Sequence, residues 1–404
     1  MLPEGYVALG LNGEKAYVRK DKFDQLRMVA AVIFDCDGVL VDIRNSYNRA
    51  ISKAVAFILK GLTGQPLPES LVSNDVIFLF RKTGGFNNDW DTVYGILMFL
   101  LSSLPEKIRG KLGKRIKAVA WQRDPFERFS SAEEAAEKNA DPAGLGFIGF
   151  SNEMVDDLKR FTELLDATGA ASVDRSLAGK HGASPALVDF HKTLKRFLCY
   201  PAGVDQSIIS RVFEEFFCGP TLFLRTYGVK PKFYRGRGMV ENEKLVIRHE
   251  TLERLAALLG EANLGIASGS RFEPAKYVLG DLLERLNPEA LVFLETIERA
   301  EHEQSTAEGL MVNLKKPHPF SLLRAAEAFG FFDCALYVGD SMEDALMAQE
   351  AKKLRKPFLF AGVYRYSGLE EALKLSFLES GCDMVIPSVN ELPLVLEAFR
   401  RGRK

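Results

Sequence analysis

The prediction of the fold starts from the stretch Met28-Val-Ala-Ala-Val-Ile-Phe34, which is followed directly by Asp35-Cys-Asp-Gly-Val-Leu-Val-Asp42. The first seven residues are all apolar and rich in β-branched side chains, and the run stops at Asp35. A short run without polar alternation is typical of a central strand in a parallel sheet, because both faces of such a strand are buried. The sequence therefore predicts a buried strand that carries acidic residues to its carboxyl end.

Similar apolar runs recur only in the second half of the chain, and helical patterns separate them. The predicted strands are 263–267, 290–294, 335–338, 357–360 and 383–386, and the predicted helices are 251–259, 319–329 and 342–353. Strands that alternate with helices of this length favour βαβ units and a parallel sheet covered on both faces. We therefore expect an α/β fold whose core is a Rossmann-like, doubly wound parallel sheet.

The interval 44–245 lacks such runs and contains amphipathic helical patterns instead. These patterns span 46–60, 91–101, 154–166, 186–197 and 205–217. The predicted organisation is an N-terminal extension (1–28), an α/β core (29–43 and 246–404) and an inserted α-helical domain (44–245). A hairpin on Asn12-Gly13 is expected inside the extension. The basic, Gly-rich stretch 230–238 is expected to be a mobile connection near the end of the insertion.

Composition excludes several functional classes. The 404 residues carry a formal net charge of -1, which argues against a protein that coats nucleic acid. No apolar segment reaches the ~20 residues of a membrane span, and 93–104 is expected to be a buried helix. The five cysteines are scattered without a Cys-x-x-Cys pair, as in a reduced cytoplasmic protein. We expect no nucleic-acid or membrane partner, and the oligomeric state stays undetermined.

Carboxylates follow two of the predicted strands. Asp35 and Asp37 come after the first strand, and Asp340 and Asp344 come after the strand at 335–338. The carboxyl ends of parallel strands form the ligand crevice of such a sheet. Carboxylates gathered there repel one another unless a cation lies among them. Hard oxygen ligands suit Mg²⁺, which also bridges to phosphate oxygens.

Groups that suit an anion occur at the same predicted edge. Ser268-Gly269 follows the strand at 263–267, and Lys316 opens the helix before the strand at 335–338. A serine on a glycine turn supplies O–H and N–H donors, and the lysine supplies positive charge. The predicted ligand is a phosphoryl group beside Mg²⁺.

These motifs together resemble the haloacid dehalogenase-like superfamily of aspartyl-nucleophile phosphatases. The pattern of that family is a strand followed by Asp-x-Asp-x-[Thr/Val]-[Leu/Val], a strand followed by Ser or Thr, a lysine, and Gly-Asp-x-x-x-Asp. This chain matches it in chain order with 35–42, Ser268, Lys316 and Gly339-Asp340-Ser-Met-Glu-Asp344. The resemblance covers 29–43 and 246–404.

The resemblance implies a role for each matched residue. Asp35 would be the nucleophile, and Asp37 would be the general acid and base. Lys316, preferred over Lys315 because it directly precedes Pro-x-Pro, would neutralise charge between Asp35 and phosphate. Ser268 and the neighbouring N–H groups, including that of Gly269, would bind phosphate. The carboxylates of Asp35 and Asp340 and the backbone carbonyl of Asp37 would hold Mg²⁺, while Asp344 would either ligate the metal or orient Lys316.

The helical insertion resembles the cap of subfamily I of the same superfamily. Within it, the segment 81–90 combines two cations, a glycine pair, two amides, a carboxylate and a tryptophan. We expect Arg81, Lys82, Asn87 and Asn88 to contact a polar substrate. The alternative is a plain helix–helix turn with Asp89 as the N-cap.

The function that the resemblance implies is Mg²⁺-dependent hydrolysis of a small phosphorylated metabolite through an aspartyl-phosphate intermediate. Two alternatives remain open at this point. A phosphomutase acting on a sugar phosphate would need the same residues. The other alternative is a non-catalytic protein that binds a phosphorylated metabolite, and the intact set of Asp35, Asp37, Lys316 and Asp340 argues against it.

Overall fold

The computed structural model describes residues 4–11, 13–86, 88–138, 151–179, 184–354 and 357–401. The chain divides into two compact units. One comprises Met1–Arg44 together with Asn242–Lys404, and the other comprises Asn45–Glu241. These divisions lie within a few residues of the boundaries expected at 43/44 and 245/246. We call the first the α/β unit and the second the helical unit.

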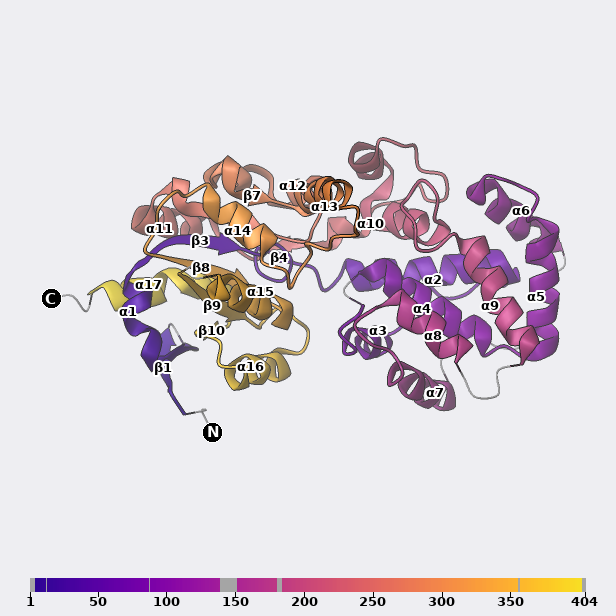
Figure 1. Cartoon of the computed structure of the whole chain (residues 1–404), viewed down its shortest axis with the longest axis horizontal. Coiled ribbons are helices and arrows are strands. Elements are labelled where there is room, and N and C mark those ends of the chain that lie inside the picture. The colour runs from indigo at the N-terminus through magenta and orange to yellow at the C-terminus, as the bar shows by residue number, and fades with distance from the viewer. Residues whose placement is uncertain are drawn as a thin grey trace. The chain divides into compact units, whose positions relative to one another are not determined.

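The α/β unit is built on an eight-stranded, mostly parallel sheet (Figure 1). The strands are β1 (Tyr6–Leu11), β2 (Glu14–Arg19), β3 (Val29–Phe34), β6 (Leu264–Ala267), β7 (Leu291–Val292), β8 (Cys334–Gly339), β9 (Phe358–Val363) and β10 (Met384–Ile386). Their order is β1-β2-β10-β9-β8-β3-β6-β7, and the six strands from β10 to β7 run parallel. This arrangement confirms the α/β, Rossmann-like sheet.

The N-terminal hairpin is part of this sheet. β1 pairs with β2 in antiparallel register, from Tyr6 opposite Arg19 to Leu11 opposite Glu14. β2 in turn pairs antiparallel with β10, with Val18 opposite Met384. The hairpin is confirmed, and its strands extend the sheet instead of standing apart as a separate extension. A short antiparallel ribbon, β4 (Val41–Asp42) with β5 (Lys244–Leu245), also belongs to this unit.

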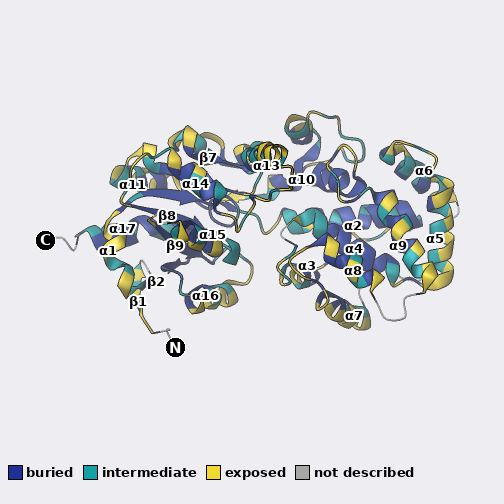
Figure 2. Cartoon of the chain, in the orientation of Figure 1, coloured by how far each residue is buried: buried dark blue, intermediate teal, exposed yellow. Residues whose placement is uncertain are grey.

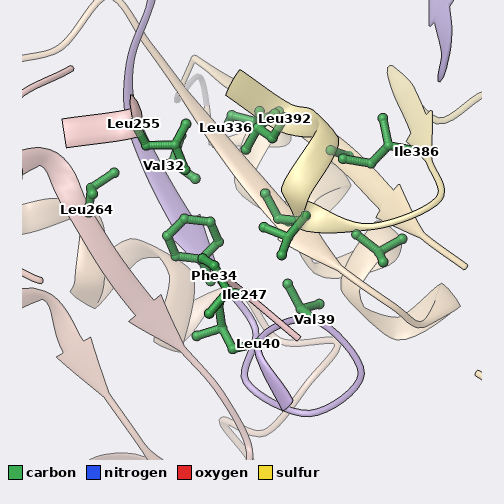
Figure 3. Close-up of a cluster of buried hydrophobic side chains, with 14 of the residues drawn as sticks. Val32, Phe34, Val39, Leu40, Ile247, Leu255, Leu264, Leu336, Ile386 and Leu392 are labelled. Carbon is green, nitrogen blue, oxygen red and sulfur yellow. The ribbon is translucent and has the colours of Figure 1, made fainter. Parts of the chain in front are cut away.

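Helices cover both faces of the sheet, as parallel strands require. One face carries α1 (Phe23–Arg27), α11 (His249–Leu259), α12 (Phe272–Leu279) and α17 (Leu392–Arg401). The other carries α13 (Leu294–Glu308), α14 (Phe320–Glu327), α15 (Met342–Lys353) and α16 (Glu370–Glu379). Figure 3 shows the first face, where Phe34 of β3 lies among apolar side chains that include Leu40 and Ile247. This packing fixes the end of β3, from which the candidate site begins.

The helical unit contains α2 (Tyr47–Thr63), α3 (Asn74–Arg81), α4 (Asp89–Ser102), α5 (Glu106–Ala118), α6 (Pro125–Lys138), α7 (Asn152–Thr162), α8 (Ala170–Ala178), α9 (Pro185–Leu198) and α10 (Ile208–Tyr227). Every residue of α4 from Thr92 to Leu101 is buried, which confirms the expected buried helix (Figure 2). The sequence patterns missed α3, α5, α6 and α8. In α5 only Leu112 and Ile116 are buried, so its sequence lacks a clear apolar period.

The stretch 230–238 is firmly attached to α10. Glu215, fully buried, accepts hydrogen bonds from the backbone N–H groups of Lys232, Phe233 and Tyr234 at 2.6–2.9 Å. Its charge is balanced by Arg211, whose Nε lies 2.6 Å away. The expectation of a mobile connection is therefore wrong, because a charged side chain distant in sequence satisfies this backbone.

Two further expectations are tested by the whole fold. All five cysteines are free thiols, and only Cys199 is partly exposed. Among the described residues, no helix combines the length and the apolarity needed to cross a membrane.

Candidate active site

The candidate site lies where the strand order of the sheet reverses. From β3 the chain proceeds to β6 and β7 on one side, and then to β8, β9 and β10 on the other. Such a reversal opens a crevice at the carboxyl ends of the two strands concerned. Asp35 directly follows β3, and Asp340 directly follows β8. The topology therefore brings these two residues to the same edge although some 300 residues separate them.

A tight loop presents Asp35 and Asp37. The N–H of Asp35 donates to the carbonyl of Val338 at 2.8 Å, which prolongs the β3–β8 ladder by one residue. After it, the N–H of Leu40 returns to the Cys36 carbonyl, and the N–H of Gly38 donates to the Val41 carbonyl, both at 2.8 Å. Cys36 and Leu40 are buried in the hydrophobic core, so their side chains anchor the loop to it.

Lys316 links two carboxylates across the site. Its Nζ lies 3.0 Å from Asp35 Oδ1 and 2.7 Å from Asp344 Oδ1, and all three side chains are buried or nearly so. Burial opposes the lysine charge, but the carboxylates of Asp344 and Asp35 raise the pKa of Lys316 well above its ordinary value. Burial likewise raises the pKa of Asp35, and the neighbouring ammonium acts against that rise.

Hydrogen-bond donors surround both oxygens of Asp344. Oδ1 accepts from the hydroxyl of Tyr337 at 2.8 Å as well as from Lys316. Oδ2 accepts from the N–H and the hydroxyl of Ser341 and from the N–H of Asp340, at 2.7–3.2 Å. Burial alone would raise the pKa of Asp344, but Lys316 and these bonds lower it. Oxygens with so many donors favour orienting Lys316 over ligating a metal.

Asp340 lies close to the other two carboxylates of the site. One oxygen each of Asp35, Asp340 and Asp344 lie within 4.8 Å of one another. Burial, with the nearby charges of Asp344 and Asp35, raises the pKa of Asp340 well above its ordinary value. A divalent cation among these oxygens would remove that penalty. The donor set fits a hard cation such as Mg²⁺, and because Asp344 already has its donors, Asp35 and Asp340 are the carboxylates best suited to hold it.

Two serines connect the end of β6 to the loop after β3. The Ser270 hydroxyl donates to Asp37 Oδ2 at 2.9 Å, and the hydroxyl oxygens of Ser268 and Ser270 lie 3.0 Å apart. Ser268 is buried, whereas Gly269 is exposed and has open space where a side chain would be. The site thus brings together the predicted residues Asp35, Asp37, Ser268, Lys316, Asp340 and Asp344.

Sequence analysis assigned no role to Ser270 or Tyr337. Ser270 could have been noticed because it lies two positions after Ser268 in a Ser-Gly-Ser turn. Tyr337 gave no such signal, since it is one more apolar-type residue in a buried strand. Its hydroxyl contacts Asp344 Oδ1, on α15, and the carbonyl of Ala267, on β6.

The residues expected to contact substrate lie in the turn between α3 and α4 of the helical unit. There Arg81 pairs with Asp89 at 2.9 Å, and Asn88 caps α4 by accepting the N–H of Trp90. Lys82 is exposed, and Asn87 lies outside the described residues. The N-cap is thus Asn88 and not Asp89, and substrate contact by these four residues stays a prediction.

Comparisons with known proteins bear on the fold alone. No protein-family profile matches the chain, and no curated protein sequence matches it. Among solved structures, the chain is similar to an X-ray structure of a target of the Northeast Structural Genomics Consortium. That likeness has a TM-score of 0.60 and 18% sequence identity, and it covers 93% of this chain and 100% of the other. It supports the α/β architecture described above.

Proposed function

We propose that this protein is a Mg²⁺-dependent phosphatase that hydrolyses a small phosphorylated metabolite through an aspartyl-phosphate intermediate. The observation that carries the proposal is the position of Lys316, between a carboxylate at the carboxyl end of β3 and the donor-rich carboxylate of Asp344. A buried carboxylate held against a cation is suited to nucleophilic attack, because the cation opposes its protonation and orients it.

Asp35 attacks the phosphorus atom of the substrate with a carboxylate oxygen. A new P–O bond to Asp35 forms as the ester P–O bond breaks, and the leaving alkoxide takes a proton from Asp37. In the second step a water molecule gives its proton to Asp37 and attacks the same phosphorus atom. The bond to Asp35 then breaks, which releases inorganic phosphate and restores both carboxyl groups.

The remaining residues stabilise the negative charge that builds up on the phosphoryl group. Lys316 offers an ammonium beside Asp35, and Ser268 offers a hydroxyl at the end of β6. Mg²⁺ held by Asp35 and Asp340 would neutralise the phosphoryl oxygens and so reduce their repulsion of the attacking carboxylate. Asp344 keeps Lys316 in place, and the capping box at the start of α15 keeps Asp344 in place.

The decisive experiment measures phosphate release from a panel of phosphorylated metabolites, with Mg²⁺ and with EDTA. We expect Mg²⁺-dependent release from a group of related esters, and loss of that release in Asp35→Asn. After an acid quench, mass spectrometry should find the phosphoryl group on the peptide that contains Asp35.

The controls separate this proposal from its alternatives. Asp333→Asn changes an exposed carboxylate of the same unit and should retain activity. An isomerised ester without free phosphate would indicate a mutase. A folded wild type that releases no phosphate from any ester, or an Asp35→Asn variant with full activity, would refute the mechanism.

A further inference from the structure

A chain of hydroxyl groups leads from the end of β6 to the candidate acid–base residue. Ser270 donates to Asp37 Oδ2 at 2.9 Å. The hydroxyl oxygens of Ser270 and Ser268 lie 3.0 Å apart, and a hydrogen bond from the Ser268 hydroxyl acts against the rise that burial causes in the pKa of Asp35. The hydroxyl of Ser270 therefore joins the turn after β6 to the carboxylate of Asp37.

The backbone of Ser270 is fixed on both sides. Its N–H donates to the Ser268 hydroxyl oxygen at 3.2 Å, and its carbonyl accepts the N–H of Leu294 at 3.0 Å. These bonds attach the residue to the turn after β6 and to the first residue of α13. Because its backbone is held, the Ser270 hydroxyl approaches Asp37 from a fixed direction. The hydroxyl of a serine on a freely moving surface loop would not do so.

The hydrogen bond from Ser270 bears on the orientation of the Asp37 carboxyl group. The side chain of Asp37 is partly exposed. A carboxyl group must present its proton along the line to the leaving oxygen, and a misplacement of about 1 Å can cost up to about 10²-fold in rate. The hydrogen bond from Ser270 restricts rotation of the Asp37 carboxyl group about its last side-chain bond.

We propose that Ser270 is a positioning residue that orients the carboxyl group of Asp37 for proton transfer to the leaving group. This inference rests on the proposed phosphatase function and assigns a task to a residue outside the four motifs. Ser270 acts through Asp37 and does not itself need to contact the substrate. Its contribution therefore depends on how much the leaving group requires a proton.

Aryl and benzyl esters of similar size test this dependence. The leaving groups become poorer from para-nitrophenyl phosphate to phenyl phosphate and benzyl phosphate, so protonation by Asp37 becomes more important along the series. In Ser270→Ala we expect kcat to fall by about 10-fold or more for benzyl phosphate. With para-nitrophenyl phosphate kcat should change little, and KM should stay constant for all three esters.

A double-mutant cycle then tests whether Ser270 works through Asp37. In an Asp37→Ala background, Ser270→Ala should cause no further loss with any ester. Ser270→Thr keeps a hydroxyl and should restore the rate with benzyl phosphate. Ser376→Ala, which removes a partly exposed hydroxyl on α16, is the matched control and should behave as wild type.

The possible outcomes lead to different conclusions. An equal loss on all three esters in Ser270→Ala, or an undiminished loss in the Asp37→Ala background, overturns the positioning role and leaves the phosphatase proposal intact. If the folded wild type hydrolyses none of the three esters and no member of the metabolite panel, both proposals fail.

Discussion

The carboxylate of Asp340 lies directly against the Cα atom of Gly38. A Cβ atom at position 38 would stand 1.8 Å from Asp340 Oδ2, and the backbone there has a φ of +71°. Glycine is therefore required twice, once for the backbone conformation and once for the space that Asp340 occupies. The loop after β3 and the loop after β8 fit together only through this missing side chain.

Gly38→Ala should displace Asp340 and weaken Mg²⁺ binding. The left-handed conformation alone costs about 1–2 kcal/mol for a residue with a Cβ, and the steric clash adds to it. The measurement is the thermal shift that Mg²⁺ produces, which should be small or absent in the variant. Gly10→Ala introduces a methyl group into open space and should keep the full shift. A normal shift in Gly38→Ala would show that Asp340 does not hold the metal.

Asp340→Asn should stabilise the metal-free protein at neutral pH. The raised pKa of Asp340 means that the folded state holds this proton more tightly than the unfolded state does. Stability of the metal-free wild type therefore falls as the pH rises from the ordinary aspartate pKa toward the raised value. The variant removes that part of the slope, because asparagine does not titrate.

The corresponding measurement is Tm against pH in EDTA, from about pH 4, near the ordinary aspartate pKa, to about pH 8. We expect the melting temperature of Asp340→Asn to exceed that of the wild type at the upper end and to approach it at the lower end. Addition of Mg²⁺ should raise the Tm of the wild type and not that of the variant. Parallel pH curves for the two proteins would contradict the charge argument.

Lys316→Met should destabilise the fold as well as abolish activity. The change leaves Asp35 and Asp344 without their cation in a buried site, which costs about 3–5 kcal/mol in comparable cases. The lowered pKa of Asp344 contributes stability above the ordinary aspartate pKa, and that contribution is lost as the pH falls through the lowered value. The deficit of the variant should therefore be largest near neutral pH and shrink in acid.

Urea unfolding of the Lys316→Met variant at several pH values checks this expectation. Lys315→Met is the matched control, because the adjacent lysine is exposed. Its free energy of unfolding should stay within about 0.5 kcal/mol of the wild type. A Lys316→Met protein as stable as this control at neutral pH would contradict the buried ion pairs.

Tyr337→Phe should weaken the support of Lys316 without changing the shape of the core. It removes the donor to Asp344 Oδ1, a hydrogen bond to a charged group that is worth about 1.5–3 kcal/mol. It also removes the 3.2 Å bond to the Ala267 carbonyl. We expect a lower free energy of unfolding and a lower kcat with unchanged KM.

The control for that variant is Tyr277→Phe, which removes a hydroxyl from a half-exposed residue of α12. It should alter neither stability nor rate. If Tyr337→Phe also altered neither, the hydroxyl would have no part in holding the Lys316–Asp344 pair.

Local sequence patterns were enough to predict the elements that are marked by a continuous apolar run of their own. The apolar run at 29–34 predicted a central strand, and the continuous apolar segment in α4 predicted a buried helix. The same patterns missed α5, in which only two residues are buried. They also misjudged 230–238, because the support of that stretch comes from Glu215, which no local pattern reveals.

Some features of the candidate site could likewise be predicted from local sequence, and others could not. The order of residues predicts that carboxylates follow β3 and β8 and that a lysine precedes β8, because a strand and the residue at its end are adjacent in the chain. Three contacts become visible only in the folded chain. Lys316 lies between Asp35 and Asp344, Ser270 contacts Asp37, and Asp340 fills the space beside Gly38. These contacts join segments far apart in the chain, and they exist because backbone hydrogen bonds pair β3 with β6 along one edge and with β8 along the other.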